Sequence, residues 1–195
     1  RCVQKPASDS NDEDTGSLYF VKGNGDIYSA LNSGNAQVAG ATHFLWSRED
    51  ALESLDVLVV DEAAQMSLAN VLAVSQAAKM LVLLGDPQQL EQPSQGSHPE
   101  GTDVSALDHI LAGHKTITDD RGLFLGVTWR LHPEICRFNS ELFYEDKLSS
   151  KAGCEQQAIT SSSLFNGFGL RYVPVVHTGN TSSSVEEVVV VENIV

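Results

Sequence analysis

Two short apolar runs with a helical pattern between them constrain the fold of this 195-residue chain more than any other feature. The runs are Asp56–Val60 and Met80–Leu84, and polar or charged residues follow each of them. Such runs are typical of strands buried on both faces of a parallel sheet. Between them, a spacing of three to four predicts a helix over residues 67–78 (Leu68, Val71, Leu72 and Ser75). Strand, helix and strand in this order predict a right-handed βαβ unit and an α/β fold.

The rest of the chain carries weaker signals. Residues 1–17 are polar and acidic, which predicts a mobile tail. Pro133 stands where a helix can begin, and Ser184 can cap a final helix. Further strands are expected at Leu18–Val21, Ala36–Val38, Leu123–Val127 and Leu170–Val176, and further helices at Ser47–Glu53 and Asp103–Leu111.

Charge and cysteine content limit the function classes. Only 12 Lys and Arg residues face 26 Asp and Glu residues, for a net charge of −14. A self-sufficient nucleic-acid binder usually shows a basic stripe, so either nucleic acid is not the partner or the basic surface lies on parts outside this stretch. Cys2, Cys136 and Cys154 form neither a disulfide framework nor a zinc pattern, which favours a reducing, cytoplasmic location. No apolar run is long enough to cross a bilayer, so no membrane partner is expected.

Polar side chains follow both predicted strands. Asp61 and Glu62 come directly after the first, and Asp86, Gln88 and Gln89 follow the second. In a parallel sheet, ligands bind outside the carboxyl ends of the strands, so these groups are expected around one crevice. Hydrolysis of a nucleoside triphosphate needs a carboxylate for Mg²⁺, a second to orient water, and a polar group at the γ-phosphate. The alternative is that the acidic pair only ends a strand and caps the next helix.

Three segments resemble motifs of superfamily 1 helicases, which have an AAA-type ATPase core. Asp61-Glu62-Ala63-Ala64-Gln65 resembles the Walker B motif, motif II, and Gly85-Asp86-Pro87-Gln88-Gln89-Leu90, with Gln92-Pro93 beyond it, resembles motif III. Thr128-Trp129-Arg130-Leu131-His132-Pro133 resembles motif IV of the branch related to the nonsense-mediated-decay helicase. The three motifs stand in the family's order across residues 40–150. The resemblance implies a RecA-like parallel sheet flanked by helices, of the P-loop NTPase type and incomplete here.

The resemblance also implies the role of individual residues toward ATP and Mg²⁺. Asp61 would hold the metal, Glu62 would polarise the attacking water, and Gln89 would contact the γ-phosphate. Gln65 would support the site, and Asp86 and Gln88 would complete the nucleotide-binding set. Arg130 would act as an arginine finger from a second RecA-like domain, and Trp129 would stack on the base of ATP. Thr42 falls in a segment that contacts nucleic acid in the family.

Some of these roles have structural alternatives. Arg130 could simply stack beside Trp129 and cover the core. His132, which precedes a proline, is expected to be a turn or cap residue and not a catalytic base. The other histidines show no spacing of metal ligands.

The sequence departs from the family at two points. Thr128 and Trp129 replace the usual Gln and Tyr, and no Gly-x-x-x-x-Gly-Lys-Ser/Thr phosphate loop occurs. Gly113-His114-Lys115-Thr116 lacks the glycine before lysine and a preceding strand, so it is not such a loop. The economical explanation is a fragment, with residues 18–120 from the first RecA-like domain and residues 121–195 from the second.

Two functions are consistent with these features. The first is an ATP-dependent, 5′-to-3′ helicase acting on single-stranded DNA or RNA, of which this piece alone is inactive. The second is a degenerate RecA-like domain that only binds or regulates a partner.

Overall fold

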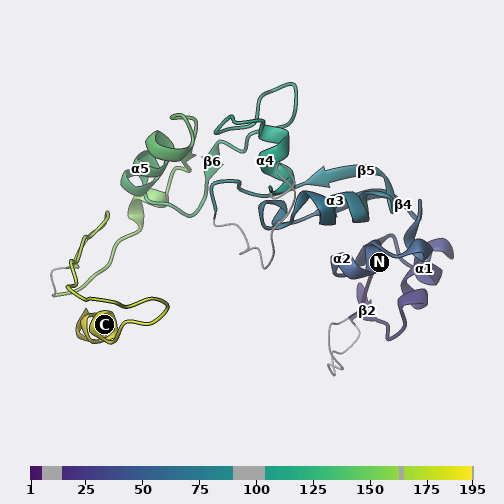
Figure 1. The fold of residues 1–195 in the computed structure, drawn as a ribbon, viewed down its shortest axis with the longest axis horizontal. Helices are drawn as coiled ribbons and strands as arrows, with labels where there is room; N and C mark the ends of the chain where they lie inside the picture. Colours follow the sequence, from purple (N-terminus) through teal and green to yellow (C-terminus); the bar gives the residue numbers. More distant parts are fainter. Residues whose placement is uncertain (6–14, 90–103, 163–164, 195) are drawn as a thin grey trace. The chain divides into compact units, whose positions relative to one another are not determined.

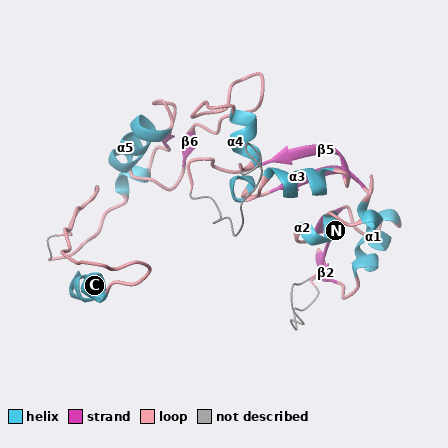
Figure 2. Cartoon of the chain, viewed as in Figure 1, coloured by secondary structure: helices cyan, strands magenta, loops and turns pink. Residues whose placement is uncertain are grey.

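The computed structural model describes residues 1–5, 15–89, 104–162 and 165–194, and the chain divides into two compact units, residues 1–124 and 125–195 (Figure 1). Both units contain helices and parallel strand pairs (Figure 2). The predicted α/β class is confirmed. None of the helices in the described ranges has the length and apolarity needed to cross a membrane.

A three-stranded parallel sheet opens the first unit. Its central strand is β1 (Cys2–Gln4), which lies between β2 (Leu18–Phe20) and β3 (Val38–Gly40). The prediction of a mobile tail is therefore wrong for residues 2–4, because Val3 is fully buried in the core between both neighbours. The rest of that predicted tail, residues 6–14, lies outside the described residues. The strand predicted at 18–21 is confirmed, and the one predicted at 36–38 is shifted toward Gly40.

Short helices connect this sheet to the rest of the unit. Helix α1 (Asn24–Asn32) was not predicted, and its Ile27 and Tyr28 are buried. The helix predicted at 47–53 is wrong in its position. The chain instead forms α2 (His43–Trp46) and a 3₁₀ turn, η1 (Glu49–Ala51). Trp46 is buried and meets Tyr28 edge to face, so tertiary packing and not local periodicity set these bounds.

The predicted βαβ unit is confirmed. Strand β4 (Leu55–Val60) pairs in parallel with β5 (Ala78–Leu83), and α3 (Leu68–Ser75) connects them after the 3₁₀ turn η2 (Ala63–Gln65) (Figure 1). Ser67 caps α3, since its Oγ accepts a hydrogen bond from the Asn70 N–H at 3.3 Å. The unit's core joins Leu58 of β4 to Val74 of α3 and to residues of the first sheet.

Burial of the β4–β5 pair differs from the prediction. Side chains alternate between the two faces of a strand, and Leu58 and Leu81 point into the core. On the other face Val57, Val59 and Met80 are 47, 54 and 59% exposed. The prediction that both faces are buried is therefore wrong for the described chain, because its core packs against one face only.

The first unit also contains α4 (Ala106–Leu111). This helix was predicted to start near Asp103, which lies outside the described residues, and Ser105 is its cap. The Leu68 N–H donates to the Val104 carbonyl at 3.0 Å, and the Ala106 N–H donates to the Met66 carbonyl at 3.2 Å. These bonds attach the start of α4 to the segment between η2 and α3.

The second unit is built on a short parallel pair, β6 (Val127–Thr128) and β7 (Ser149–Ser150), with α5 (Pro133–Phe143) between them. The helix predicted from Pro133 is confirmed. Of the strand predicted at 123–127, only Val127 lies in a strand, β6. The chain continues through a 3₁₀ turn, η3 (Cys154–Gln156), to α6 (Val185–Ile194). Ser184 caps α6 as predicted, because its Oγ accepts from the Glu187 N–H at 3.3 Å. The strand predicted at 170–176 is wrong, since no described strand pairs with it.

Candidate nucleotide site at the ends of β4 and β5

The register of β4 and β5 brings the two predicted motifs together. Val60 is paired with Leu83, so both strands end at the same edge. Beyond that pair the Leu84 N–H donates to the Val60 carbonyl at 2.9 Å, and the Ala63 N–H donates to the Leu84 carbonyl at 2.8 Å. The segments 61–63 and 84–86 therefore lie side by side, as the strand order predicts.

The acidic pair lies on a tight bend. The Asp61 Oδ1 accepts a hydrogen bond from the Glu62 N–H at 3.0 Å, and Glu62 has a φ of +53°. A left-handed conformation costs a non-glycine residue of order 1 kcal/mol, and such strain gathers at functional sites. The carboxylates of Asp61 and Glu62 are exposed, and Glu62 makes no side-chain cap to η2. Capping therefore does not account for Glu62.

Gly85 sets the distance between the two motifs. A Cβ at this position would lie 3.0 Å from the backbone nitrogens of Ala63 and Ala64 and 2.9 Å from Leu107 Cδ1. An approach of 3.0 Å to a backbone nitrogen is tighter than nine in ten real Cβ contacts, whereas Leu107 Cδ1 is the end of a flexible side chain. In the sequence Gly85 stands out only as part of motif III. The signal for its spacing role is that it brings no side chain next to the acidic pair.

The motif III segment forms a closed turn. The Asp86 Oδ1 accepts from the Gln88 N–H at 3.0 Å, and the Asp86 carbonyl accepts from the Gln89 N–H at 3.1 Å. The Gln88 side chain donates to the Lys115 carbonyl at 3.2 Å. Gln89 is exposed. Leu90, Gln92 and Pro93 of the motif lie outside the described residues.

Two further predicted residues belong to the first unit. Gln65 is exposed in η2, and its N–H donates to the Glu62 carbonyl at 2.9 Å. Thr42 is exposed at the start of α2, after β3 of the other sheet. In the described ranges no group of three or more His, Cys, Asp or Glu residues forms a metal cluster.

Trp129 and Arg130 belong to the second unit, directly after β6. Trp129 is 73% exposed, and the Lys151 Nζ lies 4.6 Å from its ring centroid. The Arg130 N–H donates to Thr128 Oγ1 at 3.3 Å, and within the described residues the guanidinium has no hydrogen bond or ion pair. The cation on Trp129 is thus Lys151 and not Arg130. His132 is a cap residue as predicted, since its Nδ1 accepts from the Glu134 N–H at 3.1 Å.

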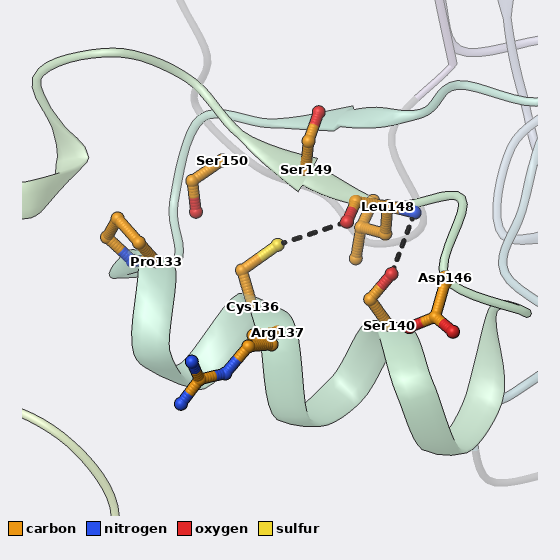
Figure 3. Close-up of a pocket in the computed structure, with 8 residues that line it drawn as sticks. All are labelled: Pro133, Cys136, Arg137, Ser140, Asp146, Leu148, Ser149 and Ser150. Carbon is orange, nitrogen blue, oxygen red and sulfur yellow. Dashed lines mark hydrogen bonds between the residues drawn. The ribbon is translucent and has the colours of Figure 1, made fainter.

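A hollow of about 290 Å³ in the second unit has none of the predicted site residues in its lining (Figure 3). Its walls are α5 and residues 146–150. Two hydrogen bonds cross it, from the Leu148 N–H to Ser140 Oγ at 3.0 Å and from Cys136 Sγ to the Leu148 carbonyl at 3.7 Å. These bonds fasten β7 to α5, which gives the hollow a structural explanation.

Known proteins share the segment that carries the carboxylates. Residues 34–92 match the AAA domain family, and this range includes motifs II and III. The mouse "5'-3' DNA helicase ZGRF1" is 36% identical over 98 residues, which are 47% of this chain and 5% of that protein. "Probable helicase MAGATAMA 3" of Arabidopsis thaliana is 28% identical over 65% of this chain and 15% of its own length. "ATP-dependent helicase NAM7" of Saccharomyces cerevisiae is 27% identical over 63% of this chain and 12% of its own.

These relatives are much longer than the region they share with this chain, which spans 5 to 15% of their lengths. The parallel α/β architecture is that of a RecA-like P-loop NTPase fragment. In motif order, fold and relatives, this chain is similar to the superfamily 1 helicases of the branch related to the nonsense-mediated-decay helicase.

Proposed function

We propose that this chain is part of an ATP-dependent helicase and supplies the metal-binding and water-activating carboxylates of its ATP site. The observation that carries the proposal is the hydrogen-bonded approach of segments 61–63 and 84–86. Asp61, at the end of β4, holds Mg²⁺, and Glu62, on its strained bend, polarises the attacking water. Gln89 contacts the γ-phosphate from the neighbouring turn, with Gln65 in support.

The remaining residues complete the site. Asp86 contacts the nucleotide from its turn, and Gln88 contributes by holding that turn to the Lys115 carbonyl. Arg130 acts as the arginine finger, which its unpaired guanidinium permits within the described chain. Trp129 stacks on the base of ATP, and Thr42 contacts nucleic acid.

The track is single-stranded DNA or RNA, followed in the 5′-to-3′ direction. The name of the mouse relative supports this polarity. The net charge of −14 supports strand contacts that lie largely on other parts of the helicase. Three free cysteines support a location in the cytoplasm.

Loss of the water-activating carboxylate tests the proposal in the complete helicase. Glu62→Gln is expected to lower single-strand-stimulated ATP hydrolysis by about 10²- to 10⁴-fold, the usual contribution of a general base. ATP binding should persist, because the amide keeps the shape of the side chain.

Glu53→Gln is a matched control. Glu53 is also an exposed glutamate with positive φ (+50°), but it precedes β4, whereas Glu62 follows that strand. Hydrolysis in this control should equal that of the wild type. Equal rates in Glu62→Gln and wild type would rule out Glu62 as the essential carboxylate.

The 195 residues alone contain no phosphate loop, so we expect no ATP turnover by them in isolation. Metal-dependent hydrolysis by this chain would contradict that expectation. A purely binding domain is the less favoured function, because the relatives are named helicases and both carboxylates are kept.

A further inference from the structure

An exposed tryptophan with a lysine on its ring stands out among the side chains of the second unit. Trp129 is 73% exposed, whereas Trp46, in the first unit, is 5% exposed. Large aromatic side chains are usually buried, and exposed ones are enriched where proteins bind ligands or partners. The Lys151 ammonium lies 4.6 Å from the ring centroid, within the range of a cation–π contact.

The backbone holds these two side chains together. Thr128 is paired with Ser150 in the parallel register of β6 and β7, so Trp129 and Lys151 are the next residues on adjacent strands. The Lys151 N–H donates to the Thr128 carbonyl at 2.8 Å, and the Ser150 hydroxyl donates to the Leu131 carbonyl at 2.7 Å. The pair thus stands just beyond the carboxyl ends of two parallel strands, where ligands bind in such sheets.

The contact between Lys151 and Trp129 also distinguishes the roles of Lys151 and Arg130. Lys151 supplies the cation at Trp129, and the Arg130 guanidinium has no partner within the described residues. The ammonium covers one face of the indole, and the high exposure of the side chain keeps the other accessible. A cation on one face and an open second face suit an aromatic ring that stacks on a nucleobase.

We propose that Lys151 is a positioning residue for nucleotide binding: it holds the Trp129 ring so that the open face stacks on the base of the bound nucleotide. The inference deepens the proposed function and rests on it, since it assumes a nucleotide at the second unit. Lys151 acts through Trp129, so its effect depends on the base and not on the phosphates.

Two ligands separate these contributions in the complete helicase. ADP carries a base, whereas inorganic tripolyphosphate has none. In Lys151→Ala we expect the Kd of ADP to rise about two- to fivefold, the factor that an exposed cation–aromatic contact supplies, with the Kd of tripolyphosphate unchanged. Lys151→Arg should restore ADP binding, because a guanidinium also pairs with an aromatic face. In a Trp129→Ala background, Lys151→Ala should add no further loss.

Lys147→Ala is the matched control. Lys147 is a partly exposed lysine of the same unit that pairs with Glu145 at 2.8 Å, and its loss should leave both Kd values unchanged. Equal weakening of ADP and tripolyphosphate in Lys151→Ala would show a general structural defect and overturn the inference. So would unchanged ADP binding, or a loss confined to single-strand affinity. A wild-type helicase that binds neither ligand would instead refute the proposed function itself.

Discussion

The close approach at Gly85 predicts a large effect from one methyl group. Gly85→Ala adds a Cβ that would lie 3.0 Å from the Ala63 and Ala64 nitrogens and 2.9 Å from Leu107 Cδ1. Leu107 is a flexible side chain and can rotate away. The two nitrogens belong to a buried 3₁₀ turn whose first N–H is bonded to the Leu84 carbonyl, so the backbone itself has to shift.

The magnitude follows from two opposing terms. Overpacking of a well-packed site costs about 1 to 3 kcal/mol. Replacing glycine by alanine recovers about 0.4 to 1 kcal/mol through the lower entropy of the unfolded chain. Gly85→Ala should therefore lower the free energy of unfolding of the first unit by up to about 2.6 kcal/mol. In the complete helicase the same shift should separate the motif II and motif III segments and reduce ATP hydrolysis.

Urea unfolding followed by Trp46 fluorescence measures this change, because Trp46 is buried in the core of the first unit. A Trp129→Phe background removes the second tryptophan. Gly40→Ala is the control: Gly40 ends β3, and a Cβ there meets nothing within 4 Å. We expect the control to be equal to or slightly more stable than the wild type. If Gly85→Ala unfolds at the same urea concentration as Gly40→Ala, the steric reasoning is wrong.

Two further predictions concern the second unit. Ser140→Ala removes a buried hydroxyl and leaves the half-buried N–H of Leu148 without its 3.0 Å acceptor, which should cost about 1 to 3 kcal/mol in thermal or urea unfolding. The exposed control Ser149→Ala should stay within about 0.5 kcal/mol, and equal losses in both variants would count against the role of burial. Glu155 accepts hydrogen bonds from its own N–H and from Gly153, which lower the pKa of its carboxyl below the ordinary 4.5. Its stabilisation is therefore present above pH 4.5 and is lost as the pH falls through the lower folded pKa, so Glu155→Gln should lose less stability on acidification than the wild type; parallel stability–pH curves would refute this.

Features that depend on neighbours along the chain were predictable from the sequence. The apolar runs at 56–60 and 80–84, with a helical spacing between them, specified the βαβ unit, because burial period and strand order are local properties. The caps at His132 and Ser184 were predictable for the same reason, since a cap contacts residues two or three positions away. The carboxylates at one sheet edge followed from parallel pairing.

A local pattern without a partner misled the prediction. Residues 170–176 are apolar enough for a strand, yet a strand needs a neighbour to receive its backbone hydrogen bonds, and no described strand pairs with them. Residues 2–4 show the converse. They lie in a polar stretch of sequence that does not predict a strand, yet they form one because they pair with β2 and β3 on either side.

Contacts between distant residues were decided by the tertiary structure alone. The close approach at Gly85 exists because η2 and the end of β5 meet there, and the left-handed bend at Glu62 follows from the same junction. Trp129 and Lys151 meet because the register of β6 and β7 places them side by side. The sequence determined which groups could do the chemistry, whereas strand register determined which of them touch, because pairing joins residues that no local pattern connects.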